Sequence, residues 1–405
     1  MSSPKRPPLP AITGIRIFLA VWVLVLHMAT FSLVFGEWLG RRPVWMQSVV
    51  ESGASAVGIF FLLSGFVLAY NYDLSRPWHA AERNRFWLAR IARVYPVYAL
   101  ALVVGIPSLV ASVWKGGAIH PASLLGGIGA VLLLVQSWIP QDALFWGGPA
   151  WSLSAEAFFY LMFPFAGRLL WKIEGRRPQL AALASLWVAT CTVAYLIALR
   201  KAPFLLAHNA STDTAWSEVI KFNPLVRLPE FLAGIVLCKL YLSIAQRSSG
   251  WAGAGRGYWL YLAGFGAALA ITAEQRHIPP AVLHDGLLLP ATCAAIIGLC
   301  LGGGWLWRML STRSIVVLGQ ASYSLYLLHM PLYSYFGAAG KRVSHHPWQA
   351  WGLLGVYVLA LVALSCITFF RLEEPMRRVI LARFSGAERR PKRVTVLQPV
   401  DADPM

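Results

Sequence analysis

Apolar stretches of about twenty residues recur along the 405-residue chain and alternate with short segments that carry its charges. A helix of that length is what the hydrocarbon core of a bilayer requires. The pattern predicts an all-α polytopic membrane protein with about ten transmembrane helices. The ten predicted spans are 15–35, 54–70, 95–113, 152–170, 180–199, 225–242, 258–272, 281–301, 315–336 and 351–370.

A further apolar segment, 122–138, is short and interrupted by glycines. If it crossed the membrane, the basic loop 168–177 and the basic C-terminal tail would both lie outside the cytoplasm, against the positive-inside rule. We therefore predict that this segment is re-entrant or interfacial and that both termini are cytoplasmic. The chain then divides into a transmembrane domain, 1–380, and a basic, disordered cytoplasmic tail, 381–405.

Composition places these helices in lipid. Hydrophobic residues make up 58% of the chain and charged residues 13%, which is too apolar for a soluble domain. The formal net charge of +18 falls between the apolar stretches, where it favours cytoplasmic loops and anionic lipid head groups over nucleic acid. The prediction is an integral protein of the bacterial inner (cytoplasmic) membrane that contacts membrane lipids and no nucleic acid.

The first apolar helix contains two polar residues that a membrane span does not need. Arg16 and His27 are three helical turns apart, so both side chains lie on one face, roughly 16 Å apart along the helix axis. An imidazole inside a bilayer costs free energy unless it lines a cavity or has a polar partner. The pair therefore predicts a functional site within the membrane.

Two arginines precede the third span. Arg90 and Arg93 lie three residues apart at the start of a helix, so their guanidinium groups share a face and can hold a phosphate or diphosphate from the cytoplasm. The alternative is a positive-inside flank whose side chains reach lipid phosphates. The residues alone favour that alternative.

Glu156 is a carboxylate within an apolar helix, and Ser152 and Ser154 precede it. Ser152 and Glu156 are four residues apart and face the same way. Carboxylates at bilayer depth are rare and mark transport pathways or proton-handling sites. A helix-start residue at the outer interface, stabilised by the helix dipole, is an equal alternative.

Two further motifs favour a structural interpretation over a catalytic one. Arg227 and Glu230 form an expected ion pair at a helix start, which would pack or orient that helix. His329 is a second intramembrane histidine, with Tyr326 on the preceding turn. A lone histidine of this kind is more often a buried polar residue with a partner than a catalyst.

Several familiar sites do not occur in the sequence. It contains no glycine-rich phosphate loop, no metal-binding spacing of His and Glu, and no Gly-x-Ser-x-Gly motif. Its five cysteines lie in apolar stretches without redox spacing. We expect no metal and no tightly bound cofactor.

Taken together, the motifs resemble the acyltransferase 3 family of integral-membrane acyltransferases, and the resemblance runs from Ile12 to about Arg378. Any one motif is weak, but seven in the family's order are specific. Thr13 and Ile17 stand where the family carries an acidic residue and a glycine, a departure that concerns the packing around Arg16. The motifs are Arg16 with His27; 60–66, which includes Ser64; Arg90 with Arg93; 151–160, which includes Glu156; Glu230 with Gly234; 323–329, which ends at His329; and Glu374 with Pro375.

The resemblance implies that 1–380 is a transmembrane acyltransferase domain. Such enzymes move an acyl group, most often acetyl, from acetyl-CoA (an acyl-CoA) as co-substrate to a hydroxyl group. The implied acceptor is a carbohydrate or lipid-linked glycan, such as an exopolysaccharide, an O-antigen or another cell-surface glycan unit.

The residues then take hypothetical roles. His27 is the general base for the acceptor hydroxyl or, alternatively, carries the acyl group as a nucleophile. Glu156 orients His27 or the acceptor, and Ser64 donates to the developing oxyanion. The assignments are catalytic for His27, Arg16 and Glu156; donor-binding for Arg90, Arg93 and Ser64; and substrate-binding or structural for Ser152, Ser154, Arg227, Glu230, Tyr326 and His329.

Two other classes of function remain as alternatives. A transporter or flippase of a lipid-linked sugar would use the intramembrane polar residues as its path, although the sequence shows no internal repeat. A structural partner within a polysaccharide assembly complex is the third possibility.

Overall fold

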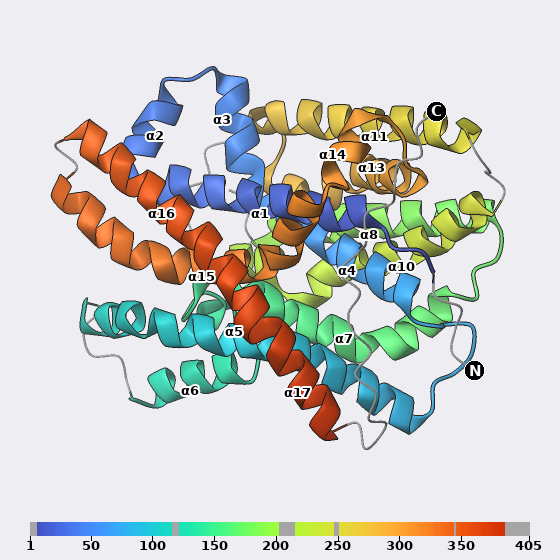
Figure 1. Ribbon diagram of the computed structural model, residues 1–405, viewed down its shortest axis with the longest axis horizontal. Helices are drawn as coiled ribbons and strands as arrows, with labels where there is room; N and C mark the ends of the chain where they lie inside the picture. Colours follow the sequence, from blue (N-terminus) through green and yellow to red (C-terminus); the bar gives the residue numbers. More distant parts are fainter. Residues whose placement is uncertain (1–5, 116–120, 202–214, 247–250, 344–345, 385–405) are drawn as a thin grey trace.

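The computed structural model describes residues 6–115, 121–201, 215–246, 251–343 and 346–384, and within these ranges it contains helices and no β-strand. These helices pack against one another in a single bundle, and the described residues form no second domain (Figure 1). The α-helices are α1 Pro10–Phe31, α2 Leu33–Gly40, α3 Val44–Glu51, α4 Ser55–Asn71, α5 Ala80–Lys115, α6 Pro121–Leu132, α7 Trp151–Leu170, α8 Arg176–Lys201, α9 Ala215–Phe222, α10 Pro224–Ala245, α11 Trp251–Ala273, α12 Pro280–Val282, α13 Leu289–Leu301, α14 Gly304–Leu310, α15 Arg313–Val343, α16 Pro347–Thr368 and α17 Glu374–Phe384.

Eight helical segments of the described chain are long and apolar enough to cross a membrane, and they coincide with eight of the predicted spans. The predicted class, an all-α polytopic membrane protein, is confirmed. The eight segments are Pro10–Phe31, Val44–Asn71, Ala80–Trp114, Gly148–Leu170, Arg176–Lys201, Ala215–Ala245, Arg313–Gly340 and Pro347–Phe384.

The other two predicted spans differ from the expectation. Span 258–272 lies within α11, which is 23 residues long but is not among the eight. Span 281–301 is broken by a π-helical turn, Leu283–Leu287, in which Gly286 has a positive φ, so that α13 has only 13 residues. After residue 301, Gly302, Gly303 and Gly304 all have positive φ, and α13 meets α14 at an angle of 81°. The described residues therefore hold eight such spans, or nine if the bent pair counts as one, in place of ten.

Segment 122–138 does not cross the membrane as a helix. Its helical part, α6, has 12 residues, which gives a length of roughly 18 Å against the ~30 Å of a bilayer core. The prediction that this segment is not a span is therefore confirmed. Of the predicted tail, 381–384 form the end of α17, and 385–405 lie outside the described residues.

The first helix begins and ends earlier than the predicted 15–35. Pro10 occupies the first turn of α1, where its fixed φ and missing N–H suit a helix start. At the other end Ser32 has extended backbone angles, and its side chain accepts a hydrogen bond from the Phe35 N–H at the start of α2. Residues 33–35 therefore belong to α2, not to the first span.

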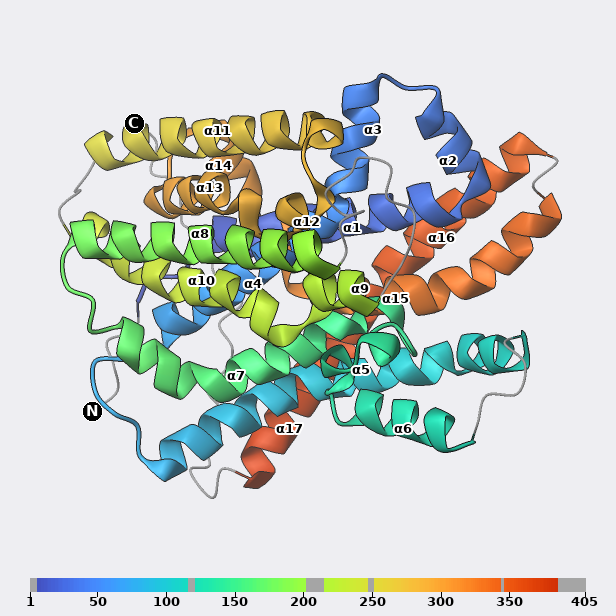
Figure 2. The same cartoon turned by 180° about the vertical axis from the view of Figure 1, so that it is seen from behind.

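Small residues allow two pairs of helices to touch along their backbones. A Cβ atom on Gly65 of α4 would lie 2.0 Å from the Phe231 carbonyl oxygen of α10, and one on Gly234 would lie 2.0 Å from that of Leu62. Gly319 of α15 lies equally close to α1. Such close packing is how membrane helices associate without a hydrophobic driving force between them. It fixes α4 on α10 and α1 on α15, as both views show (Figures 1 and 2).

Several polar contacts tie the helix ends together at the side where α1 begins. Arg6 donates hydrogen bonds to the carbonyls at the end of α4, Arg168 near the end of α7 donates to the Ser75 carbonyl, and Arg176 at the start of α8 donates to the Ser243 carbonyl of α10. The basic loops expected in the cytoplasm thus share one side of the molecule with the start of α1.

Candidate active site

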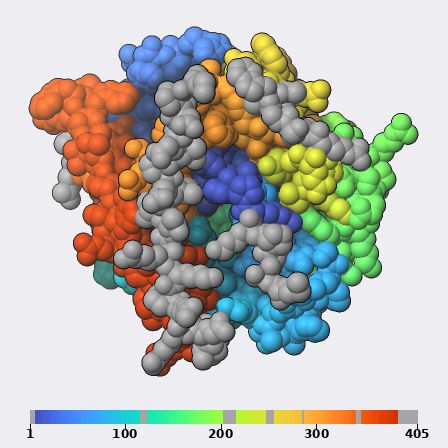
Figure 3. Space-filling model, turned by 45° about the vertical axis from the view of Figure 1, so that its right-hand side comes forward, coloured from blue at the N-terminus to red at the C-terminus, as the bar shows by residue number. Residues whose placement is uncertain are grey.

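A cavity of about 650 Å³ lies between α1, α4, α5, α7, α15 and α17. Figure 3 looks toward the end of the molecule at which α1 begins, and a recess is visible beside it. Helices that are distant in sequence therefore share one space. Seven of the predicted site residues line it: Arg16, Ser64, Arg90, Arg93, Ser152, Glu156 and Tyr326.

Arg90 enters the cavity between aromatic rings. Its guanidinium carbon lies 5.7 Å from the ring centroid of Phe86 and 5.9 Å from those of Tyr72 and Tyr160. These cation–π contacts and a hydrogen bond of 3.4 Å from Nη2 to the Tyr72 hydroxyl hold the side chain, while Nε has no hydrogen-bond partner among the described residues. No carboxylate forms an ion pair with Arg90 among the residues that the structure describes. Arg90 is therefore positioned and still able to bind an anion.

Arg93 is held by a carboxylate that the sequence analysis did not select. Its Nη2 atom lies 3.7 Å from Oε1 of Glu373, which is nearly fully buried, and the other Glu373 oxygen accepts a hydrogen bond of 3.3 Å from Ser324. Glu373 ends a π-helical turn, Phe369–Glu373, between α16 and α17. Because 3.7 Å exceeds a hydrogen-bond distance, the N–H groups of Arg93 stay available to a ligand.

Positive charge exceeds negative charge in the cavity lining. Arg16, Arg90, Arg93 and Arg377 face a single lining carboxylate, Glu156. Arg16 forms no ion pair within the described ranges, whereas Arg377 is 3.0 Å from a Glu374 oxygen. A water-accessible space with this balance attracts a ligand that carries several negative charges.

Glu156 accepts two hydrogen bonds on the same oxygen. Ser64 donates to its Oε1 atom at 2.8 Å and Tyr160 donates at 2.5 Å. The carboxylate is thus fixed between α4 and its own helix, facing the cavity. The hydrogen-bond partners of Glu156 among the described residues are two hydroxyls, so these contacts do not support the expectation that Glu156 orients His27. Orientation of a ligand in the cavity remains open to it.

His27 has a histidine partner. Nε2 of His329 lies 3.3 Å from Nδ1 of His27, and the two ring centroids are 4.9 Å apart. The same Nδ1 atom lies 2.9 Å from the Val23 carbonyl oxygen, and Nδ1 of His329 lies 2.5 Å from the Tyr326 carbonyl oxygen. The two intramembrane histidines, which the sequence treats as separate motifs, form one pair.

The two carbonyls define where the ring protons lie. A carbonyl oxygen can only accept, so each Nδ1 atom that contacts one carries a proton. Nε2 of His329 is then the lone-pair side of its ring, and the single Nδ1–H of His27 is shared between the Val23 carbonyl oxygen at 2.9 Å and this Nε2 atom at 3.3 Å. Nε2 of His27 is left as an unprotonated acceptor, which is the state that a general base requires.

Tyr326 lies between the cavity and the histidine pair. It lines the cavity, and its hydroxyl is 3.0 Å from both the Pro149 carbonyl and the Ser152 hydroxyl. Its ring centroid is 5.8 Å from that of His329, one turn further along α15. Neither His27 nor His329 lines the described cavity. The cavity and the histidine pair are therefore adjacent regions and not one pocket.

Three more of the predicted site residues, Ser154, Arg227 and Glu230, are buried outside the cavity. Ser154 is buried and accepts a hydrogen bond from the Ser137 N–H at 3.2 Å. Arg227 and Glu230 form an ion pair of 3.1 Å with both side chains at most 4% exposed, and the pair packs against Gly58 of α4. These contacts agree with the structural interpretation that the sequence favours for the pair.

Several polar residues that line the cavity, among them Tyr160, Tyr323 and Arg377, were not among the selected sites, and neither was Glu373, which contacts Arg93. Glu373 and Arg377 follow an apolar run and resemble an ordinary basic and acidic interfacial flank. The adjacent acidic pair Glu373–Glu374 before a proline was a visible signal, but only the fold shows that Glu373 points inward. Among the described residues no group of three or more His, Cys, Asp or Glu side chains is arranged to hold a metal ion.

Comparisons with known proteins identify similar chains. The chain is 30% identical over 383 residues to "Acyltransferase MdmB" of Streptomyces mycarofaciens, covering 90% of this chain and 89% of that protein. It is 26% identical to "Exopolysaccharide production protein ExoZ" of Rhizobium meliloti, over 80% of this chain and 90% of that protein. It is 24% identical to "Putative peptidoglycan O-acetyltransferase YrhL" of Bacillus subtilis, over 80% of this chain and 48% of that protein.

No solved structure matches the chain. A model of the acyltransferase domain, in contrast, matches residues 9–370, which include the histidine pair and every residue that lines the cavity except Arg377. The chain belongs to the acyltransferase 3 family of membrane acyltransferases.

Proposed function

We propose that this protein transfers an acyl group, acetyl in the first instance, from acyl-CoA to a hydroxyl group of a carbohydrate acceptor. The observation that carries the proposal is the arrangement along α1: an arginine-rich cavity around Arg16 and, three turns further on, a histidine with a free Nε2 atom. The names of two relatives, which refer to exopolysaccharide production and to peptidoglycan O-acetylation, support a glycan as the acceptor.

The donor fits the cavity by charge. Coenzyme A carries phosphate groups at one end and its thioester at the other. Arg90 and Arg93 are three residues apart on α5 and offer N–H groups that match phosphate oxygens. With the phosphates there, the pantetheine arm extends past Arg16 and Tyr326 toward His27. The volume of about 650 Å³ is in the range of pockets that enclose small organic ligands.

The chemical step uses Nε2 of His27 as the general base. It removes the proton of the acceptor hydroxyl while the hydroxyl oxygen forms a bond to the thioester carbonyl carbon. The C–S bond then breaks, the acyl group stays on the acceptor, and the CoA thiolate takes the proton from the imidazolium. His329 stabilises the imidazolium by accepting from Nδ1–H, so the charge that appears on His27 is not left without a partner.

The oxyanion that forms on the thioester carbonyl needs a donor. Ser64, the residue first considered, already donates its only proton to Glu156. Arg16 cannot take this role, because it lies roughly 16 Å from His27 along the axis of α1. It lines the cavity and has no carboxylate partner in the described chain, so we assign it to binding the negative charges of the donor. Ser64 and Glu156 then form a fixed polar wall that positions the donor.

Aromatic side chains follow one another from His27 in the direction that leads away from the cavity. Phe31 stacks near the His27 ring and contacts Tyr333, and Phe35, Trp38 and Trp351 form a cluster one step further. Flat aromatic faces suit the C–H faces of sugar rings. We propose that the acceptor approaches from this side and the donor from the opposite side, where the basic loops place the cytoplasm.

This sidedness fits a protein of the bacterial inner membrane with both termini in the cytoplasm. Acyl-CoA is then taken from the cytoplasm, and the hydroxyl is presented within or beyond the membrane. No cofactor is needed besides the co-substrate, because both charge stabilisation and proton transfer come from side chains of the chain itself.

Release of the CoA thiol from acetyl-CoA tests the proposal. The purified protein is placed in liposomes with and without a candidate glycan, beside the variant His27→Ala. Thiol release that requires the acceptor and is lost in the variant is expected. Release that survives His27→Ala would move the chemistry away from this helix, and sugar uptake into vesicles without CoA-dependent chemistry would favour a transporter.

A second measurement separates the base from the acyl carrier. Protein incubated with a mass-tagged acetyl-CoA and no acceptor is quenched and digested, and the peptide that contains His27 is weighed. We expect no tag on His27, since attack by the hydroxyl needs only one activated oxygen. A trapped acyl-imidazole would replace the base mechanism by nucleophilic catalysis.

A further inference from the structure

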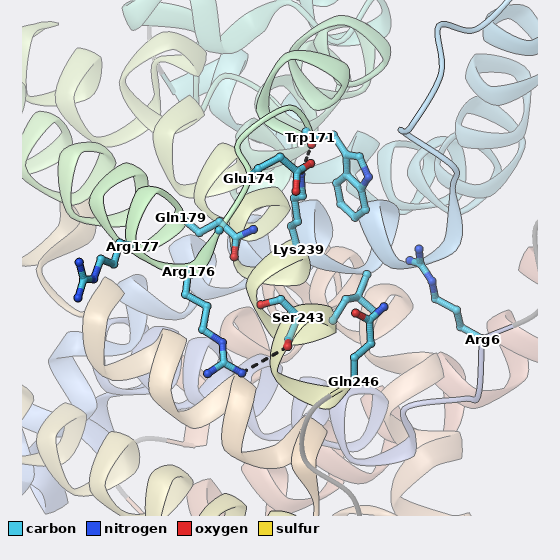
Figure 4. Close-up of a pocket in the computed structure, with 11 residues that line it drawn as sticks. Arg6, Trp171, Glu174, Arg176, Arg177, Gln179, Lys239, Ser243 and Gln246 are labelled. Atoms are coloured by element: carbon cyan, nitrogen blue, oxygen red, sulfur yellow. Dashed lines mark hydrogen bonds and ion pairs between the residues drawn. The ribbon is translucent and has the colours of Figure 1, made fainter.

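A second cavity, of about 500 Å³, lies where α7 passes into α8 (Figure 4). Its described lining comes from the segment before α1, the α7–α8 connection, the start of α8 and the end of α10, and it shares no residue with the first cavity. Four cationic side chains and a single carboxylate, Glu174, belong to this lining. The cationic side chains are Arg6, Arg176, Arg177 and Lys239.

Only one of the four positive charges is matched by a negative one. Lys239 forms an ion pair of 2.8 Å with Glu174 and also donates to the Trp171 carbonyl. In Figure 4 these groups lie together at one end of the cavity, with Arg6 on one side and Arg176 and Arg177 on the other.

Two of the three arginines, Arg6 and Arg176, donate hydrogen bonds to neutral carbonyl groups. Arg6 donates to the Ala69 and Tyr70 carbonyls at 3.2 and 2.7 Å, and Arg176 donates to the Ser243 carbonyl at 3.4 Å. No ion pair joins Arg6, Arg176 or Arg177 to a carboxylate within the described residues. The cavity is therefore electropositive and offers N–H donors to an anion.

The cavity lies at the depth of lipid head groups. One membrane-spanning segment ends at Leu170 and the next begins at Arg176, and the cavity is built between them. Trp171 in its lining is the residue type that anchors helices at this level. Leu169 and Leu180, next to the lining in sequence, are 65% and 54% exposed and face the surroundings of the bundle. Apolar surface thus adjoins a cationic pocket.

We propose that this cavity binds the phosphate-bearing head group of an anionic phospholipid, with the acyl chains running along the exposed leucines of α7 and α8. A basic pocket between membrane helices on the cytoplasmic side is the setting in which such head groups bind. The adjoining apolar surface favours a lipid over a soluble phosphate, because a soluble ion gains nothing from it. Bound there, the lipid joins α1, α7, α8 and α10 at one end of the bundle.

Native mass spectrometry of the purified full-length chain tests the site. The protein in detergent is titrated with phosphatidylglycerol or with zwitterionic phosphatidylcholine, and bound lipids are counted. We expect the first phosphatidylglycerol molecule to bind at a lipid concentration roughly tenfold lower than the concentration at which any further phosphatidylglycerol molecule binds. Arg176→Gln/Arg177→Gln is expected to weaken that first binding roughly tenfold or more, and Arg6→Gln weakens it independently.

The matched control is Arg85→Gln/Arg313→Gln. Both arginines are exposed, both lie at helix starts on the same side, and neither lines the cavity. This double variant removes the same number of positive charges as Arg176→Gln/Arg177→Gln, and it is expected to leave the binding of the first phosphatidylglycerol unchanged. Equal weakening in both double variants would reduce the effect to net charge and overturn the site. Unfolding midpoints equal to that of the parent chain exclude a folding defect.

Inorganic phosphate separates the two sources of the anion. If the cavity binds a lipid head group, inorganic phosphate at the same concentration as phosphatidylglycerol does not displace the bound phosphatidylglycerol. Displacement by phosphate alone, or equal binding of phosphatidylcholine, would contradict the lipid assignment. None of these readouts depends on acyl transfer, so the outcome is independent of the proposed activity.

Discussion

The two ends of the polar face of α1 lie in the same membrane and differ in charge. Around Arg16 the cavity lining carries four arginines against one carboxylate. Around His27 the contacts are uncharged: a second imidazole, a backbone carbonyl and the Phe31 ring. A charged cavity suits a ligand that brings its own opposite charges, whereas a neutral pair can move a proton without leaving a fixed charge in lipid. In the proposed mechanism, one helix thus separates binding of the donor from proton transfer.

A third polar pair shows that residue type alone does not create either region. Arg227 and Glu230 have the same chemistry as Arg93 and Glu373, but their ion pair is 3.1 Å long and closed between helices. The cavity pair is 3.7 Å long, and Arg93 is open to the cavity. A site for ligands therefore requires both charge and access.

The largest effect on acyl transfer is expected from a substitution at the His27 end of α1, where the contacts are uncharged. His27→Ala removes the general base and is expected to lower kcat by about 10²- to 10⁴-fold while leaving the KM for acetyl-CoA unchanged. Steady-state kinetics of thiol release in liposomes checks this. A KM that rises as much as kcat falls would mean that His27 belongs to the binding region and that the two ends do not divide the work.

The second effect is on the charged end. Arg90→Gln/Arg93→Gln removes the donors for the CoA phosphates and is expected to raise the KM for acetyl-CoA roughly 100-fold, with kcat at saturation little changed. Arg85→Gln, an exposed arginine on the same helix, is the control. Unchanged binding of CoA by the double variant in calorimetry would remove the phosphate-binding role.

A smaller effect is expected from the partner of His27. His329→Leu leaves Nδ1–H of His27 with the Val23 carbonyl alone and is expected to reduce kcat roughly tenfold. His329→Gln supplies a carbonyl acceptor and is expected to restore most of the loss. A structural role would make both variants equally impaired, so comparison of their kcat values, per folded molecule, distinguishes positioning from packing.

The smallest effect on acyl transfer is expected from substitutions in the buried ion pair of Arg227 and Glu230. Arg227→Met/Glu230→Leu keeps the volume, removes both charges and is expected to leave kcat and KM within about twofold. Arg227→Met alone leaves a buried carboxylate without this partner and is expected to destabilise the fold by about 3–5 kcal/mol. Thermal unfolding in detergent measures the stability. Loss of transfer in the folded double variant would show that this pair is part of the site.

Most helices could be predicted because their cause is local. Length and apolarity alone identify a span, so eight of the ten predicted segments recur in the structure. The failure at 281–301 has a physical reason: apolarity does not reveal that the backbone forms a π-helical turn at Leu283–Leu287, with a positive φ at Gly286, which leaves only 13 residues for α13. Hydropathy counts residues, while the end of a helix depends on backbone conformation.

The sequence by itself determined the membrane class, the position of Arg16 and His27 on one helix face, and the shared face of Arg90 and Arg93, because each follows from composition or from helical period. It did not determine where α5 begins, which is at Ala80, ten residues before Arg90. Only the tertiary structure decided that Glu373 holds Arg93, that Ser64 and Tyr160 hold Glu156, and that His329 lies against His27. These partners are brought together by helix crossings in which glycines such as Gly65 and Gly319 let backbones touch. Periodicity specifies the face of one helix; which face of another helix meets it is a matter of packing.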